Sequence, residues 1–307
     1  VTVLVLAAVF FSQRLGTDRI AAFFGPIMLV WFSALAVLGL YGIIQAPQVL
    51  AGLDPRYGIR LMVEHWDLAG VILGACFLAV TGGEALYADL GHFGRPVIAR
   101  AWLFVAMPAL MLNYFGQGAI VLVDANAVRN PFYDLCPDMF DVPLLLLATA
   151  ATVIASQAII TGVFSLAKQA IELGYLPPMR MRYTSEHNEQ HIYVGRLNWL
   201  LMIACIAVVL GFEASERLAS AYGIAVAFAM VTTTLLFVAQ VRRAWGWPPA
   251  AVWAMAAGML VVDLVFATAN MTKIADGGWL PLSIAAWIIL IMVSWRRGLE
   301  AVVAQQV

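Results

Sequence analysis

One short stretch of the sequence combines three kinds of group that together suit the binding of an ion. Thr81, Gly82, Gly83 and Glu84 supply a hydroxyl, bare backbone and a carboxylate in consecutive positions, inside a run of apolar residues. Two glycines in a helix cost about 2 kcal/mol relative to two alanines. Where such a run crosses a lipid bilayer, bare backbone is tolerated only if it lines a cavity or is buried in protein, and a central acid is costly and usually functional. The pattern therefore predicts a helix that is interrupted at a binding site.

The chemistry of this stretch favours a small, hard cation. The half-helix before the break, residues 74–80, ends in carbonyl groups whose aligned dipoles carry partial negative charge. Thr81 adds a hydroxyl oxygen, and Glu84 adds a carboxylate three residues on, on the same helical face. Glu84 also lies in the first turn of the following half-helix, whose positive end repels cations. We therefore expect the ion nearer the carbonyls and Thr81, with Glu84 behind it or carrying a proton. The alternative is a glycine pair for close helix packing, with Glu84 bonded to backbone or facing a polar cavity.

Other polar residues in the apolar runs are secondary candidates. Asn113 and Gln117 share one helical face, where they either make interhelical hydrogen bonds or support the site. Tyr222 opens another run and either borders the site or lies at the membrane interface. Asp263 lies near the end of its run, and we expect it to pair with Lys273.

The composition requires a membrane around these residues. Hydrophobic residues make up 63% of the 307-residue chain and charged residues 11%, against about half and about a quarter in soluble domains. Because a span needs about 20 mostly apolar residues, the runs predict an all-α polytopic membrane protein. The predicted crossings are residues 21–44, 68–90, 97–123, 142–167, 197–212, 218–240, 250–269 and 279–295, after a shorter run at residues 1–11 that we interpret as the end of a truncated helix.

The basic residues predict the orientation. Most of the 17 Lys and Arg residues fall in loops on one side, including Arg180, Arg182, Arg196 and the pairs at 242–243 and 296–297. The positive-inside rule places that side in the cytoplasm, with the first residues outside and the last residues inside.

Several classes of function are excluded or disfavoured. The net charge of −1 offers no basic face for nucleic acid. No phosphate-binding loop is present, and no apolar run carries a paired nucleophile and base or a metal-ligand cluster, so we predict a protein that is not an enzyme and has no cofactor. A channel would need a repeated, carbonyl-rich pore loop. A permease for amino acids or amines is the alternative function, disfavoured because Glu84 occupies the half-helix N-terminus that would bind a substrate carboxylate.

Four segments resemble the KUP/HAK/KT family of potassium-uptake permeases. They are TGGEALYADLGHFG at residues 81–94, LNYFGQGA at 112–119, KQAIELGYLPPMR at 168–180 and ADGGWLPL at 275–282, and further matches in family order cover almost the whole chain. The resemblance implies a twelve-span domain with the five-plus-five inverted-repeat fold of leucine-type transporters. It implies uptake of potassium across the plasma membrane, the inner membrane of a bacterium, with protons as the coupling ion. Membrane lipid is a further expected partner, and a homodimer is the expected assembly.

The resemblance also implies which residues bind the ion and which of the family's spans this chain contains. Thr81 and Glu84 match the ion-site threonine and acid of the family's discontinuous sixth span, so they are expected to bind potassium, and Tyr222 matches a tyrosine that closes over the ion. On this alignment the chain runs from the fourth to the twelfth span, and it lacks the family's Gly-Asp-x-Gly-Thr-Ser motif and third-span acid. We therefore expect residues 1–307 to be one transmembrane domain, a fragment without the N-terminal spans and the soluble C-terminal domain. Its ion site is then incomplete, and we expect it not to transport potassium alone.

Overall fold

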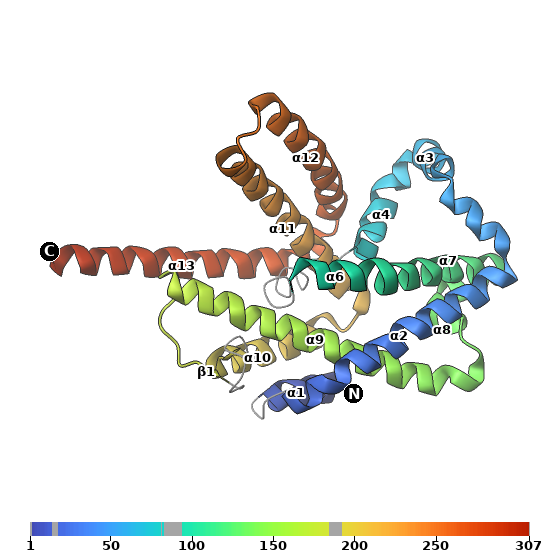
Figure 1. The fold of residues 1–307 in the computed structure, drawn as a ribbon, viewed down its shortest axis with the longest axis horizontal. Coiled ribbons are helices and arrows are strands. Elements are labelled where there is room, and N and C mark those ends of the chain that lie inside the picture. Colours follow the sequence, from blue (N-terminus) through green and yellow to red (C-terminus); the bar gives the residue numbers. More distant parts are fainter. Residues whose placement is uncertain (1, 14–17, 81, 83–93, 184–191, 307) are drawn as a thin grey trace. The chain divides into compact units, whose positions relative to one another are not determined.

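The chain is built almost entirely of helices, as the predicted all-α polytopic class requires (Figure 1). The computed structural model describes all residues except 1, 14–17, 81, 83–93, 184–191 and 307. The α-helices are α1 (Thr2–Ser12), α2 (Asp18–Gln45), α3 (Pro55–Glu64), α4 (Trp66–Cys76), α6 (Arg95–Ala101), α7 (Met107–Val123), α8 (Pro131–Asp134), α9 (Asp141–Glu172), α10 (Gly195–Phe212), α11 (Ser215–Ala244), α12 (Pro249–Met271) and α13 (Trp279–Gln306). Short 3-10 turns cover Pro47–Leu53, Phe77–Val80, Ala125–Val128 and Asp138–Phe140, and π-helical turns cover Trp102–Ala106 and Ile274–Gly278.

In the part of the chain that the structure describes, seven helical stretches are long and apolar enough to cross a membrane. They are Phe23–Gln45, Arg95–Val123, Asp138–Glu172, Gly195–Phe212, Ser215–Ala244, Pro249–Met271 and Trp279–Gln305, and each coincides with a crossing predicted from the sequence. Two shorter apolar helices, Thr2–Ser12 and Trp66–Ala79, match the incomplete first run and the first half of the crossing that was predicted to be interrupted. The seven uninterrupted crossings are therefore confirmed as helices.

The chain divides into two compact units, which are described separately. The first unit comprises Val1–Ile59, Glu84–Gln169 and Met179–Ile203. The second unit comprises Arg60–Gly83, Ala170–Pro178 and Ala204–Val307.

In the first unit, α2 and α7 touch backbone to backbone at glycines. A Cβ atom added at Gly116 would lie 2.6 Å from the Cα of Gly39, and one added at Gly42 would lie 2.7 Å from the Gly116 carbonyl oxygen. A Cβ at Gly39 would meet the backbone of Leu112 more closely still. Without a hydrophobic driving force between helices in lipid, such small residues let van der Waals packing hold helices together.

Polar contacts hold the other helices of the first unit. The Gln13 side-chain amide at the end of α1 donates to Gln157 Oε1 of α9. The Asn198 amide in the first turn of α10 donates to the Phe10 carbonyl at 3.1 Å. A two-stranded antiparallel ribbon, β1 (Arg182–Tyr183) with β2 (Ile192–Tyr193), precedes α10 and was not predicted.

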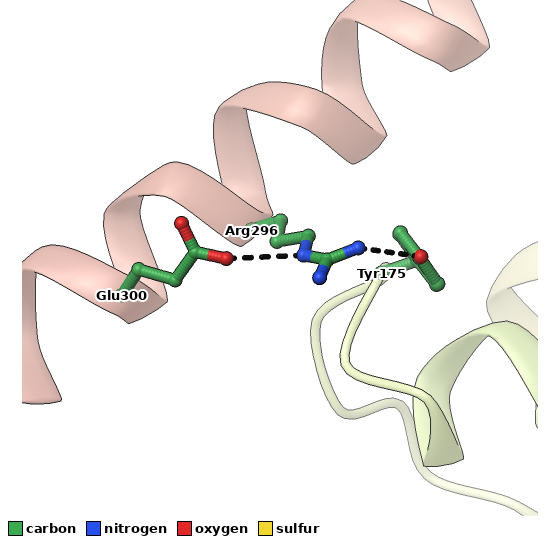
Figure 2. A network of polar contacts seen from close by, with 3 residues as sticks. All are labelled: Tyr175, Arg296 and Glu300. Atoms are coloured by element: carbon green, nitrogen blue, oxygen red, sulfur yellow. Dashed lines mark hydrogen bonds and ion pairs between the residues drawn. The ribbon is translucent and has the colours of Figure 1, made fainter.

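In the second unit, α11 packs against α12, and α4 packs against α12. The segment after α9 contacts α13 through Arg296, which lies between two partners (Figure 2). Arg296 Nε donates to Glu300 Oε1 at 3.1 Å and its Nη1 donates to the Tyr175 hydroxyl at 2.5 Å. The contact is exposed and contributes at most about 1 kcal/mol, but it places Tyr175 and Arg296 together, which agrees with the predicted location of both on the cytoplasmic side.

The glycine contact between α2 and α7 generates a stability prediction. Gly39→Ala places a methyl group against the Leu112 backbone, which cannot move aside as a side chain can, so we expect a loss of about 1–3 kcal/mol in stability. Gly25→Ala is the matched control, because Gly25 lies on the same helix and no atom of the described residues lies within 4 Å of an added Cβ. The measurement is the midpoint of thermal unfolding of the purified chain in detergent. Equal midpoints for the two variants would contradict the close approach.

Candidate functional site

Helix α4 leads toward the predicted break. Helix α4 stops at Cys76 and tightens into a 3-10 turn over Phe77–Val80. Gly82 then has a φ of 102°, a conformation that side-chain-bearing L-residues rarely adopt. No atom of the described residues lies within 4 Å of a Cβ added at Gly82, and the backbone angle alone favours glycine there. The other predicted site residues of this stretch, Thr81, Gly83 and Glu84, lie outside the described residues.

A positive charge lies on the carbonyl end of this half-helix. Lys273, which follows α12, donates from Nζ to the Gly74 carbonyl oxygen at 3.0 Å. A Cβ at Gly74 would lie 3.0 Å from that same Nζ, so the absence of a side chain leaves room for the ammonium group. The sequence analysis predicts that the carbonyl dipoles at this end of the helix attract a cation, and the Lys273 ammonium group is a cation bound there.

The start of α11 lies beside the same half-helix. A Cβ added at Gly223 would lie 3.7 Å from Leu78 Cδ2 in the 3-10 turn and 2.7 Å from Asn270 Oδ1 at the end of α12. Tyr222, the preceding residue, is 39% exposed. The structure thus brings the Tyr222 segment close to the break, while the role of Tyr222 in closing over an ion stays a prediction.

Asn270 is a candidate that the sequence analysis missed. Its side chain is fully buried, with 0% exposure, and its Nδ2 donates to the Phe266 carbonyl at 2.9 Å. Among the described residues its Oδ1 has no hydrogen-bond partner. A buried acceptor without a donor costs about 1–3 kcal/mol, and this oxygen lies against Gly223 at the start of α11. The signal in the sequence was a lone Asn in the last turn of an apolar run, which is rare and often functional.

Asp263 does not pair with Lys273, and that prediction was wrong. Asp263 Oδ2 accepts a hydrogen bond of 2.6 Å from the Thr234 hydroxyl of α11, and the two residues are only 5% and 4% exposed. Lys273 lies beyond the end of α12 and binds Gly74, whereas Thr234 lies across the contact between α11 and α12. A buried carboxylate is costly unless a donor satisfies it, and the hydroxyl supplies that donor.

Asn113 and Gln117, the predicted supporting residues, belong to the first unit. Gln117 Nε2 donates to Asn113 Oδ1 at 2.6 Å, one turn along α7. The buried Asn113 donates in turn to the Leu35 carbonyl of α2 at 3.5 Å. The interpretation as an interhelical hydrogen bond is confirmed, and a supporting role at the ion site stays a prediction.

Comparison with known proteins gives a consistent result. Residues 1–300 match the family model described as the K+ potassium transporter integral membrane domain. The chain is 86% identical over 306 residues to a protein of Xanthobacter autotrophicus named "Probable potassium transport system protein Kup", covering 100% of the chain and 49% of that relative. A protein of the same name from Azorhizobium caulinodans is 79% identical over 99% of the chain, and the match covers 49% of that relative. Another from Pseudomonas fluorescens is 50% identical over 97% of the chain, and the match covers 47% of that relative.

The chain therefore spans about half the length of the curated relatives it matches. No solved structure matches it. With the seven apolar helices, these matches make the chain an integral, multi-pass protein of the plasma membrane. They give no support to a permease for amino acids or amines.

The pair of Asp263 and Thr234 generates a second stability prediction. Thr234→Val removes the donor and leaves a buried carboxylate oxygen without a partner, so we expect a loss of about 1–3 kcal/mol. Thr233→Val is the matched control on the same helix, because the exposed Thr233 hydroxyl bonds only the Ala229 carbonyl of its own helix at 2.8 Å. Thermal unfolding midpoints in detergent measure both effects.

A double-variant cycle with Asp263→Asn tests whether the two side chains act together. We expect Thr234→Val to cost less in the Asp263→Asn background, because a neutral amide is less costly to leave without its partner than a carboxylate. Additive effects of the two substitutions would contradict the direct contact.

Proposed function

Because the chain belongs to the K+ potassium transporter family, whose integral membrane domain matches residues 1–300, we propose that it forms part of a transporter that takes up potassium ions across the plasma membrane. The observation that carries the proposal is the family match itself. It is supported by the names of the relatives, which are those of potassium transport proteins and not of enzymes. The contact of Lys273 with the Gly74 carbonyl supports it further, since the end of this half-helix binds one positive charge in the described residues.

We propose that potassium binds at the break after Val80. Removing water from the ion is costly, so several oxygen atoms have to replace its hydration shell. The half-helix carbonyls, the Thr81 hydroxyl and the Glu84 carboxylate are the proposed ligands, with the backbone of Gly82 and Gly83 giving the ion close access. Lys273 then acts as a neighbouring fixed charge that limits how many cations this end of the helix holds at once.

Proton coupling is proposed for the same carboxylate. Symport requires that the proton and the ion are bound at the same time. A protonated Glu84 still offers its carbonyl oxygen to the ion, while the half-helix carbonyls and Thr81 supply the other ligands. The proton and the ion then cross together and leave on the cytoplasmic side. The support for this step is the presence of a single acid directly after a glycine pair in an apolar run.

The proposed architecture is the five-plus-five inverted repeat, in which this chain supplies the fourth to twelfth of twelve spans as a single transmembrane domain. In that fold the remaining oxygen ligands come from spans outside residues 1–307, and a homodimer is the proposed assembly. The helix that stops in mid-run at a glycine with positive φ supports this architecture, because discontinuous helices are typical of such repeats.

A chimera tests the function in a complete transporter. The matching segment of the Xanthobacter autotrophicus relative is replaced by residues 1–307, which the 86% identity permits, and expressed in a bacterial strain without its own potassium-uptake systems. We expect growth on low-potassium medium and uptake of rubidium. Failure of a correctly inserted chimera to take up either ion would contradict the proposed function.

Glu84→Gln tests the role of the acid in that chimera. We expect rubidium uptake to fall by about tenfold or more across about pH 5 to pH 8, because the amide neither carries a charge nor exchanges a proton. Glu64→Gln is the control, since Glu64 is an exposed acid that pairs with Arg60 at 2.7 Å. Wild-type uptake by Glu84→Gln throughout this range would remove both the ion-binding and the proton-carrying role.

Asn270 is tested by its effect on affinity. Asn270→Ala removes a buried oxygen beside the break, so we expect the KM for rubidium to rise by about tenfold, which corresponds to about 1.4 kcal/mol. Asn198→Ala is a matched control, because Asn198 is also buried with an Oδ1 that lacks a partner among the described residues, but it lies in the first unit on α10. A rise in KM of the same size for both variants would show a general effect of lost packing.

A further inference from the structure

Three arginines line one pocket in the first unit. The pocket has a volume of about 640 Å³ and is lined by Arg180, Arg182, Tyr193, Gly195, Arg196 and Trp199. The side chains come from the strand ribbon, the residues just before it and the first turn of α10. Among the described residues, no acidic side chain lines it. The proposed function does not use this pocket.

The ribbon has two unlike faces, and the polar one contributes to the pocket. Arg182 lies directly opposite Tyr193 in the antiparallel register, which places both side chains on the same face. Ile192 and Val194, on either side of Tyr193 in sequence, are buried. Because side chains alternate across a strand, burial of Ile192 and Val194 directs Tyr193 and Arg182 to the opposite face.

The walls of the pocket are held by contacts with other helices. The Tyr193 ring meets the Phe164 ring of α9 edge-on at 5.9 Å, and the Trp199 ring meets the Phe11 ring of α1 edge-on at 5.2 Å. The buried Asn198 fixes the first turn of α10 through its bond to the Phe10 carbonyl. The arginines therefore project from a supported frame, so less conformational freedom is lost when a ligand binds them.

The positive charges of the three lining arginines favour an anionic ligand. Three guanidinium groups around one pocket repel each other, and an anion with several acceptor oxygens relieves that repulsion. Arginine binds phosphate oxygens through two parallel hydrogen bonds, and a phosphate group offers more acceptors and more charge than a carboxylate. Gly195 and Arg196 line the pocket and are also the first residues of α10, and the positive end of a helix dipole favours an anion. Tyr193 and Trp199 offer apolar or planar surface for the rest of the molecule.

We propose that Arg180, Arg182 and Arg196 form a binding site for a phosphate-bearing ligand, on the side of the membrane that the basic loops place in the cytoplasm. Two sources supply this chemistry there, the headgroup of an anionic phospholipid and a soluble phosphate compound. A lipid headgroup would anchor the strand ribbon and the start of α10 to the inner leaflet. A soluble compound would act as an effector. The sequence between the strands contains Glu186 and Glu189, which lie outside the described residues.

The chimera, purified in detergent, is titrated with three probes while its thermal unfolding midpoint is followed. Dioctanoyl phosphatidylglycerol represents the lipid source, pyrophosphate represents the soluble source, and dioctanoyl phosphatidylcholine is the headgroup control with no net charge. We expect one of the first two to raise the midpoint with a saturable concentration dependence, and the third to have no such effect. The probe that binds identifies the source.

Substitutions then locate the binding. The triple variant Arg180→Gln, Arg182→Gln and Arg196→Gln should weaken binding by about tenfold or more. The double variant Arg242→Gln and Arg243→Gln should not, although it removes basic residues predicted on the same side of the membrane. All three pocket arginines are exposed, so the triple variant is expected to fold. Arg182→Lys, which keeps the charge and loses the planar fork, should weaken binding severalfold and serves as a second variant.

The proposal is overturned if neither phosphate probe binds, because the three arginines then have no measurable affinity for a phosphate group. It is overturned equally if a probe binds with the same affinity to the triple glutamine variant, or if the control pair weakens binding as much. These readouts measure binding alone, so they are independent of whether the chimera transports potassium.

Discussion

Within a lipid bilayer no water is at hand for backbone polar groups, so each peptide N–H and C=O has to find its partner inside the protein. Long uninterrupted helices such as α9 and α11 satisfy this constraint by themselves. The end of α4 differs from these, because it tightens into a 3-10 turn and is followed by Gly82 with positive φ. The Gly74 carbonyl in its last turn accepts a hydrogen bond from the Lys273 ammonium group. A helix that ends within the membrane presents carbonyl dipoles at its C-terminal end, and oxygen dipoles of this kind are what the predicted cation site needs.

The same constraint explains why so many helix contacts in this chain are polar or involve glycine. Lipid tails are as apolar as leucine, so burying leucine between helices gains little, and close packing or hydrogen bonds have to supply the attraction. Gly39 and Gly116 allow close packing of two backbones. Thr234 and Asp263 form a hydrogen bond between two helices. The large apolar side chains, such as those of Trp287 and Ile289 on α13, are left exposed on the helix surfaces, where lipid is their natural solvent.

The sequence predicts well those properties that depend on neighbours along the chain. Span length, apolar composition and the end of the α-helix before Gly82 are local, and each agrees with the described residues. The shared face of Asn113 and Gln117 is also local, because one helical turn separates them.

Properties that depend on which helices lie side by side could not be predicted. Asp263 was paired with the nearest lysine in sequence, but the contact between α11 and α12 gives it Thr234. The missing partner of Asn270 Oδ1 is visible only once its surroundings are known. The ribbon at Arg182–Tyr183 was missed because two residues per strand carry no periodic signal. Thr81 and Glu84, the centre of the predicted site, lie outside the described residues, so their roles stay predictions.

The glycine contact between α2 and α7 has a mechanical consequence. Gly39, Gly42 and Gly116 form a notch in which two backbones meet, and sliding one helix along the other by a single residue would bring a side chain into that notch. Leu40 and Gln117, the residues that follow Gly39 and Gly116, are far too large for it. The register of this pair is therefore locked, and the two helices move as one rigid body. If the protein alternates between inward-open and outward-open states, the hinge for that motion has to lie outside the α2–α7 pair.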